Sequence, residues 1–368
     1  MATTYLVTGG LGFIGRYLCR ELLASGHRVR VLDSVVPQVH GTRPPEAPEG
    51  TEVFRDDVRD AAAVRRALDG VEGVFHLAAE VGVGQSMYEV ERYVSANDVG
   101  TAVLLQELIQ RPVRRVVVAS SMSVYGEGRY RDASGAPARP LARTAADAKA
   151  RRWDPVGPDG RPLEPVPTDE EKPPDLASIY ALTKYMQERA VLIFGQAYPV
   201  EGVALRLFNV FGPGQSLSNP YTGVLANFSS RLQNERAPLV FEDGQQRRDF
   251  VHVRDVARAF RLAMERPEAA GQVLNIGSGR SYTVCQVAEL LGRALSSPLR
   301  PEILQKARSG DIRHCFADIT RARRVLGYEP QFFLEDSLEE FVEWVRREDA
   351  ADHSDEMTQQ LEARGLVS

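Results

Sequence analysis

Tyr180 and Lys184 stand four positions apart in Tyr180-Ala-Leu-Thr-Lys184, a spacing that suits acid–base chemistry. On a helix, such residues lie about one turn apart on the same face. An ammonium near a phenol favours the phenolate, so the tyrosine could exchange a proton well below its free pKa of about 10. Because Tyr-x-x-x-Lys pairs also arise by chance on amphipathic helices, the rest of the chain must decide whether this pair is functional.

A helix is the element that must carry this pair. Ser178 precedes it as a candidate N-cap, and an apolar stripe continues to Phe194, where Gly195 is expected to end the helix.

Three glycines near the amino terminus predict a phosphate-binding turn. The strand-like Tyr5-Leu-Val is followed by Gly9, Gly12 and Gly15, which open a predicted helix that runs to about Ser25 and carries Phe13 and Ile14 in its first turn. Glycines allow close backbone approach, and the free N–H groups at a helix start suit a pyrophosphate. The strand–turn–helix context is the one that a dinucleotide site requires.

Asp33 ends the next predicted strand, 28–32, about 20 positions beyond the glycines. A carboxylate at this point accepts hydrogen bonds from a ribose diol and repels a 2′-phosphate, which favours NAD over NADP. The alternative is a helix cap or an ordinary loop residue.

Strands and helices continue to alternate, which predicts an α/β fold with a doubly wound parallel (Rossmann) sheet. Predicted strands cover 52–54, 74–77 and 116–119, and predicted helices cover 60–68 and 90–110. Because ligands bind at the carboxyl ends of parallel strands, we expect Ser121, Tyr180 and the glycine turn to meet there. His76, inside an apolar strand, is expected to be a hydrogen-bonded core residue.

Composition limits the classes of function. The 368 residues carry 45 basic and 50 acidic side chains, a net charge of −5, which disfavours nucleic-acid binding. The first residues run straight into a strand and no apolar run reaches membrane-spanning length, so we expect no signal peptide, no membrane contact and a cytoplasmic protein. Three scattered cysteines predict neither a disulfide framework nor a metal site.

The carboxyl-terminal half is expected to form a smaller α/β region. We predict an NAD-binding domain over 1–200, a mainly substrate-binding region over 201–347 with some segments returning to the sheet, and a polar tail or weak helix over 348–368. Within 201–347 the pattern predicts a hairpin between 240 and 251, strands at 203–207 and 273–276, and helices at 221–233, 255–265, 283–295, 319–326 and 334–344.

Together these motifs resemble the extended short-chain dehydrogenase/reductase family, and within it the nucleotide-sugar epimerases and dehydratases. The likeness rests on Thr8 to Gly15, Asp33, His76 to Ala79, Asn97, Ser121 with Val124-Tyr125-Gly126, Tyr180 with Lys184, Arg206-Leu-Phe-Asn209, Arg248-Asp-Phe250, Asn275-Ile-Gly277 and Arg308-Ser-Gly-Asp311.

The resemblance implies a role for each position. Tyr180 would be the acid/base, Ser121 would hydrogen-bond the sugar oxygen, and Lys184 would hold the nicotinamide ribose and lower the Tyr180 pKa. Asp57 and Val58 would flank the adenine, with Leu77, Ala78 and Ala79 against the cofactor. Asn97 would bridge strand ends or hold a water, or would be a structural hydrogen-bonding residue. Substrate would be bound by Ser123, Asn209, Arg248, Arg308 and Asp311.

The residues after Ser121 separate sub-classes within this resemblance. Related 4,6-dehydratases place an Asp-Glu pair there, whereas this chain has Met122 and Ser123, which cannot act as a general acid or base near neutral pH. The expected activity is therefore an NAD-dependent nucleoside-diphosphate-sugar 4-epimerase, and the family implies a homodimer formed through helices 90–110 and 180–194. A nucleotide-sugar 4-ketoreductase and a non-enzymatic cofactor sensor are the alternatives, and dTDP and UDP both remain open.

A segment rich in Pro, Ala, Arg and Gly interrupts the pattern at about 127–175. Its likeness is to dTDP-L-rhamnose 4-epimerase-like members, which carry an extended segment before a Pro-Thr-x-Glu-x-Lys-Pro stretch, here 167–173. It shows little periodicity, so it is expected to lack structure of its own and to be a lid over the sugar pocket, or else a surface elaboration or partner contact.

Overall fold

A computed structural model describes residues 2–41, 46–221, 223–308 and 310–367. Thr222 of the predicted helix 221–233, Ser309 of the Arg308–Asp311 motif and Ser368 of the predicted tail lie outside the described residues.

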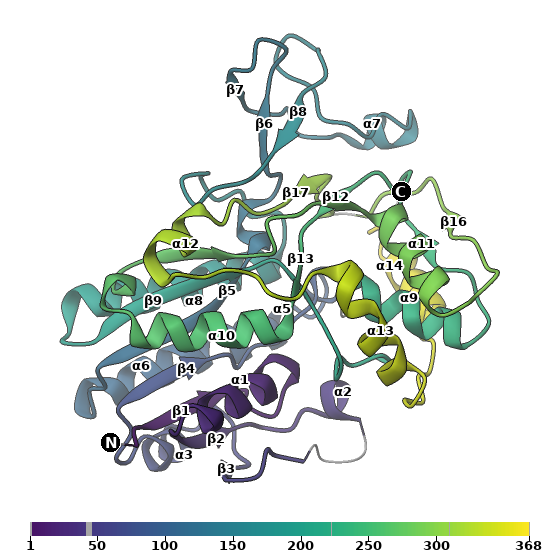
Figure 1. Cartoon of the computed structure of the whole chain (residues 1–368). Helices are drawn as coiled ribbons and strands as arrows, with labels where there is room; N and C mark the ends of the chain where they lie inside the picture. Colours follow the sequence, from purple (N-terminus) through teal and green to yellow (C-terminus); the bar gives the residue numbers. More distant parts are fainter. Residues whose placement is uncertain (1, 42–45, 222, 309, 368) are drawn as a thin grey trace.

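A parallel seven-stranded sheet forms the centre of the molecule (Figure 1), in the order β14-β9-β5-β4-β1-β2-β3. The strands are β1 (Thr4–Thr8), β2 (Arg28–Leu32), β3 (Thr51–Phe54), β4 (Gly73–His76), β5 (Arg115–Ser121), β9 (Glu201–Leu207) and β14 (Val273–Ile276). The predicted doubly wound sheet is confirmed. Its strand order reverses between β1 and β4, the position at which such sheets bind ligands.

Helices cover both faces of this sheet. On one face lie α1 (Phe13–Ala24), α10 (Val253–Glu265) and α12 (Thr320–Leu326), and on the other lie α3 (Ala61–Ala67), α6 (Gly100–Gln110) and α8 (Ile179–Ala197). Successive side chains of a strand point to opposite faces. Val117 of β5 accordingly joins the core beneath α1 and α10, and Val116 joins the core beneath α6 and α8.

The predicted helix 90–110 is continuous but not uniform. It comprises α5 (Val90–Tyr93), a π-helical segment, η1 (Val94–Val99), and α6. A π segment widens the helix by one residue per turn and often marks a functional position. Asn97 lies inside it, fully buried.

The predicted hairpin between 240 and 251 is wrong. The structure has β11 (Leu239–Val240), which pairs with β16 (Glu302–Ile303); β12 (Arg247–Arg248), which pairs with β15 (Tyr282–Thr283) and β17 (His314–Cys315); and β13 (Phe250–His252), which pairs with β10 (Asn209–Phe211). Each short strand therefore pairs with a strand distant in sequence, and the segment does not fold back on itself.

A second core holds the smaller region together. It forms between α9 (Val224–Gln233), α11 (Val284–Ala294) and α13 (Leu334–Val345), around buried aromatic side chains that include Phe228 and Phe341. α11 begins in a capping box, in which Thr283 and Gln286 satisfy each other's backbone N–H groups. The remaining short helices are α2 (Pro37–His40), α4 (Val83–Ser86), η2 (Met122–Tyr125) and η3 (Pro267–Ala269).

The carboxyl-terminal segment is a helix packed onto the body. α14 (Ser354–Ala363) buries Met357 and Leu361, so of the two expectations for this segment, a tail or a weak helix, the structure shows a helix. Within the part of the chain that the structure describes, no helix has the length and apolar character needed to cross a membrane.

The segment 127–175 also has structure of its own, contrary to expectation. It contains β6 (Arg129–Arg131), β7 (Pro137–Ala138) and β8 (Glu164–Val166), in a three-stranded antiparallel sheet, and α7 (Ala145–Lys149). Figure 1 shows this sheet projecting from the main body. Trp153 and Leu163 are buried within the segment and give it a small core.

Candidate active site and dinucleotide cradle

One cavity of about 660 Å³ runs along the carboxyl edge of the sheet, from the glycine turn to the smaller region. Nearly all predicted site residues line it: Gly9, Gly12, Phe13, Ile14, Gly15, Asp33, Asp57, Val58, Leu77, Ala78, Ala79, Ser121, Ser123, Tyr180, Lys184, Asn209, Arg248, Arg308 and Asp311. Asn97 is the exception, and no described residue of the 127–175 segment lines the cavity. The lid interpretation of that segment therefore has no support in this structure.

The glycine turn forms a tight backbone cradle. A Cβ on Gly15 would lie 2.3 Å from the Gly9 carbonyl oxygen, and a Cβ on Gly9 would lie 2.8 Å from the Ala78 backbone nitrogen. α1 begins at this turn with no side chain capping its first N–H groups and no acidic residue in its first turn. Unpaired donors at a positive helix end fit an anionic diphosphate.

Asp33 lies at the end of β2, where its carboxylate braces the same turn. Its Oδ2 accepts from the Leu11 backbone N–H (2.9 Å) and its Oδ1 from that of Val35 (2.9 Å). Burial raises its pKa, but hydrogen bonds from His40, Val35 and Leu11 outweigh burial and hold the pKa below its usual range. A fixed negative charge at this position suits a ribose diol and opposes a 2′-phosphate.

Asp57 lines the cavity, and the resemblance implies that the adenine lies beside it. Its carboxylate accepts from the Arg59 backbone N–H (2.8 Å) and guanidinium, and the Arg59 side chain lowers the Asp57 pKa.

Ser121 and Tyr180 meet on one wall of the cavity. Ser121 ends β5, whose residues are buried throughout, and its Oγ accepts from the Ser123 backbone N–H (3.1 Å). Tyr180 stands in the first turn of α8, which Ser178 caps as predicted by accepting from the Ala181 N–H (3.1 Å). Burial raises the pKa of Tyr180, and a hydrogen bond with Ser121 lowers it.

Lys184 lies one turn along α8, buried behind Tyr180, and its Nζ donates to Gln187 Oε1 (2.6 Å). Burial lowers its pKa to about 7, and the nearby carboxylates of Asp98 and Glu188 raise it. That Lys184 lowers the Tyr180 pKa stays a prediction, because in this structure the Lys184 ammonium is engaged by Gln187 and the hydrogen bond that lowers the Tyr180 pKa comes from Ser121.

Asn97 does not line the cavity but hydrogen-bonds to residues beside its wall. Its Oδ1 accepts from the Glu80 N–H (2.7 Å) and its Nδ2 donates to Thr183 Oγ1 (2.9 Å), between the two residues of the Tyr–Lys pair. Its side chain is buried and hydrogen-bonded to the segment after β4 and to α8, as expected of a structural hydrogen-bonding residue, and its role toward the cofactor stays a prediction.

A buried ion pair joins that helix to the sheet. Arg206 of β9 makes a double hydrogen bond to Glu188 of α8 (2.9 and 2.6 Å), and Ser120 donates to the same carboxylate (2.7 Å). The Arg206 guanidinium also lies 4.7 Å from the ring centre of Tyr125, whose hydroxyl donates to Asn275 Oδ1 (2.7 Å). These contacts hold the end of β5, and so Ser121, beside α8.

His76 is confirmed as a core residue. Its ring nitrogens contact Thr8 Oγ1 (2.8 Å) and Thr101 Oγ1 (2.9 Å), and burial lowers its pKa to about 3, so the imidazole is neutral.

The predicted substrate residues line the other end of the cavity. Asn209 Oδ1 is buried with no hydrogen-bond partner among the described residues, so an acceptor is left open there. The Arg248 guanidinium is held by the main-chain carbonyls of Ile312 and Arg313, and Arg308 donates to Asp311 (2.8 Å) while lying 4.4 Å from the Phe241 ring centre.

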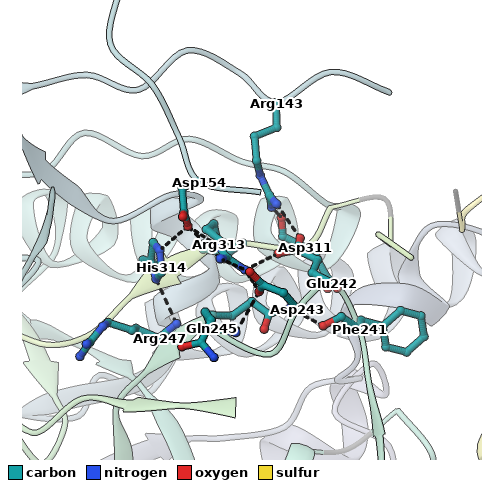
Figure 2. Close-up of polar contacts among 12 residues, drawn as sticks. Arg143, Asp154, Phe241, Glu242, Asp243, Gln245, Arg247, Asp311, Arg313 and His314 are labelled. Atoms are coloured by element: carbon teal, nitrogen blue, oxygen red, sulfur yellow. Dashed lines mark hydrogen bonds and ion pairs between the residues drawn. The ribbon is translucent and has the colours of Figure 1, made fainter. Parts of the chain in front are cut away.

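Arg143 and Asp154 anchor the 127–175 segment to the residues around Asp311 and Arg313 (Figure 2). Fully buried Arg313 donates to Asp154 (2.8 Å), Glu242 (2.9 Å) and Asp243 (2.6 Å). Arg143 donates to Glu242 (2.5 Å) and to the Asp311 carbonyl (2.8 Å).

Several residues that shape the site had no sequence signal. Gln187, one turn from Lys184 on α8, and Asp98 of η1 act on Lys184 without lining the cavity. Tyr221, Met357 and Leu361 reach the cavity from segments with no recognised motif. The apolar i, i+4 spacing of Met357 and Leu361 indicates a buried helix face but gives no hint of the cavity.

Comparison with known proteins agrees with this geometry. The model of the NAD-dependent epimerase/dehydratase family matches residues 5–147 and 155–277. The chain belongs to this family. NAD is therefore its cofactor, and the open helix start, the glycine cradle and Asp33 fit that group.

Individual relatives cover nearly the whole chain. It is 36% identical to a dTDP-L-rhamnose 4-epimerase of Burkholderia thailandensis over 93% of this chain and 95% of that protein. It is 32% identical to a UDP-glucose 4-epimerase of Mycolicibacterium smegmatis, covering 93% and 98% of the two chains.

Solved structures show the same fold. The UDP-glucose 4-epimerase of Thermotoga maritima with UDP-glucose aligns with a TM-score of 0.77 and 30% identity, over 94% of this chain and 99% of that one. The Thermus thermophilus UDP-glucose 4-epimerase in complex with NAD aligns with a TM-score of 0.75 and 26% identity, over 94% and 99%.

Proposed function

We propose that this protein is a nucleoside-diphosphate-sugar 4-epimerase that oxidises C4 transiently and returns the hydride to the opposite face. The observation that carries the proposal is the meeting of Ser121 and Tyr180 on one wall of the cavity, with Lys184 one helix turn behind. Bound NAD supplies the hydride acceptor and donor for C4.

In this proposal the chain's own residues move one proton and hold the sugar. Tyr180, as phenolate, accepts the proton of the C4 hydroxyl, and Ser121 donates a hydrogen bond to the same oxygen. The keto-sugar then turns in the cavity and presents the opposite face of C4 to the hydride. Tyr180 returns the proton to the same C4 oxygen. Such a positioned acid/base contributes about 10² to 10⁴ in rate.

The residues beside Ser121 favour epimerisation over dehydration. Met122 and Ser123 follow Ser121, and Ser123 contributes a backbone N–H to the Ser121 oxygen. A thioether and an aliphatic hydroxyl do not exchange protons near neutral pH, so water elimination lacks its acid and base.

We propose dTDP-L-rhamnose and its C4 epimer, dTDP-6-deoxy-L-talose, as the first substrate pair to examine, with UDP-sugars second. Support comes from the 36% identity to a dTDP-L-rhamnose 4-epimerase over almost the full chain. The diphosphate would lie against Asn209 and Arg248, and the nucleotide against Arg308 and Asp311.

We also propose a homodimer through α5–α6 and α8. The large apolar side chains exposed in this chain include five on these adjacent helices: Val90, Val94, Val99, Leu182 and Ile193. Apolar patches of this kind typically mark protein–protein interfaces.

A cofactor-free assay tests the proposed activity. Purified protein is incubated with dTDP-L-rhamnose, without added nicotinamide cofactor, and products are identified by NMR. The proposal predicts catalytic formation of the C4 epimer. Turnover that requires stoichiometric NADH would identify a 4-ketoreductase instead.

A further inference from the structure

The carboxyl-terminal helix α14 forms one wall of the main cavity. Five residues of this segment line the cavity: Ser354, Met357, Thr358, Leu361 and Leu366. Met357 and Leu361 are 6% and 2% exposed, so the helix presents an apolar face inward. The helix therefore contributes surface to whatever occupies the cavity.

This segment is tied to the body along its length, so its position is defined. Arg231 of α9 donates to Asp352 (3.3 Å) and Asp355 (2.9 Å), and both Arg231 and Asp352 are buried. Further along, Lys306 pairs with Glu362 (2.7 Å). Val367 then forms a bridge with Arg308, a residue that lines the cavity.

The helix lies beside the sugar end of the cavity. Leu361 packs over Gly84, where an added Cβ would be 3.5 Å from a Leu361 methyl group. Two residues on, Ser86 Oγ accepts from the backbone N–H of Tyr180 (3.0 Å). The α4 turn is thus in contact with α14 on one side and with the start of the catalytic helix on the other.

Met357 and Leu361 give the inward face of α14 an apolar surface, and the two hydroxyls beside them each make a hydrogen bond within the protein. Ser354 Oγ already accepts from Asn227 (3.0 Å), and Thr358 Oγ1 donates to the Ser354 carbonyl (2.9 Å). Val83 and Met87 of the facing segment line the same cavity and add to the apolar surface. A hydroxyl or carboxylate placed against Met357 and Leu361 would lose water without gaining a hydrogen bond from either side chain.

We propose that Met357 and Leu361 are specificity-determining residues that contact the C5 substituent of the sugar and select a methyl group over a hydroxymethyl or carboxylate. The inference rests on the proposed function for the presence of a nucleotide sugar in the cavity. Discrimination between two substituents that differ by one hydroxyl in an apolar pocket is typically about 10- to 100-fold.

The test compares dTDP-L-rhamnose with synthetic dTDP-L-mannose, which differs from it by one hydroxyl on C6. Dissociation constants are measured by calorimetry and kcat/KM by NMR, for wild type, Met357→Gln, Leu361→Gln and the control Gln359→Ala, which changes an exposed residue of the same helix. Wild type and Gln359→Ala should favour the rhamnose compound at least tenfold. Both glutamine variants should reduce that preference to about threefold or less.

A conservative variant and the melting temperatures decide between the possible outcomes. The conservative Leu361→Met variant should retain the preference, which separates loss of apolar contact from loss of folding. Glutamine variants with wild-type melting temperatures and unchanged preference would overturn the inference, as would a wild type that binds both sugars equally or neither. If wild type binds with the expected preference but converts neither sugar, the proposed 4-epimerase function fails while the assignment of the wall stands.

Discussion

Lys184 combines burial with a positive charge at the centre of the candidate site. Burial lowers its pKa to about 7 from an ordinary 10.5, although Asp98 and Glu188 raise it. The unfolded chain therefore binds more protons than the folded chain between about pH 7 and 10.5. As pH rises through that window, the free energy of unfolding therefore increases, because deprotonating the buried Lys184 in the folded chain costs less. Below pH 7 both states are protonated, and the full cost of burying the ammonium remains.

The variant Lys184→Met should therefore be more stable than wild type at pH 6, by about 1–3 kcal/mol, with the advantage shrinking by pH 9. Urea unfolding of both proteins, stripped of cofactor, measures the difference. Lys149→Met, which changes an exposed lysine of α7, should alter stability by no more than about 0.5 kcal/mol at either pH. Equal or lower stability of Lys184→Met at pH 6 would contradict the burial argument.

Tyr180 is the acid/base of the proposed reaction, so removing its hydroxyl should abolish proton transfer while leaving the cavity intact. Tyr180→Phe should lower kcat by about 10³-fold or more and change the dissociation constant of dTDP-L-rhamnose by less than about threefold. Tyr185→Phe, on the same helix, serves as the control and should keep near wild-type kcat. Substantial turnover by Tyr180→Phe would rule out the assigned role.

Residue types and their spacing predicted the residues that line the cavity, but not Gln187 and Asp98, which influence Lys184 without lining it. Gly9 to Gly15, Asp33 and Tyr180 are local signals, because a turn, a strand end and a helix turn each fix them within a few residues. Gln187 and Asp98 carry no such signal. Gln187 contacts Lys184 from three positions along α8, whereas the influence of Asp98 arises from the π segment, whose packing against α8 depends on the whole fold.

At the scale of elements, the same division between local and distant interactions explains what could be predicted. The alternating strands and helices of the sheet follow from periodicity, and α8 and α11 begin at caps readable in the sequence. The predicted hairpin failed because β11, β12 and β13 are two- or three-residue strands whose partners are distant in sequence. The 127–175 segment likewise depends on an anchor outside itself.

The ion pairs that anchor the 127–175 segment lead to a prediction about Arg313. It holds fully buried Glu242 together with Asp243 and Asp154, and removing its guanidinium leaves Glu242 with Arg143 alone and takes the arginine partner from both aspartates. Arg313→Met should lower the free energy of unfolding by about 3 kcal/mol and expose 127–175 to proteolysis.

The control for this prediction is Arg152→Ala, which removes an exposed pair with Asp147 in the same segment. Its cost should stay below about 1 kcal/mol. Urea unfolding and limited trypsin digestion measure both effects, and equal behaviour of the two variants would refute the anchoring role of Arg313.

At the scale of the whole molecule, the apolar residues exposed on α5, η1 and α8 suit a symmetric contact between two copies. The double variant Leu182→Arg/Ile193→Arg should shift the protein from dimer to monomer in size-exclusion chromatography with light scattering. Leu141→Arg, which changes an exposed leucine of the 127–175 segment, should leave the mass unchanged. A wild type that is monomeric at micromolar concentration would contradict the proposed dimer.

The central claim, that hydride leaves C4 and returns to the opposite face of the same sugar, is tested most directly with substrate carrying deuterium at C4. The purified protein converts this dTDP-L-rhamnose in ordinary water without added cofactor, and NMR and mass spectrometry locate the label. The account predicts a C4 epimer that retains deuterium at C4. An epimer in which solvent hydrogen has replaced the label, or no epimer at all, would contradict it.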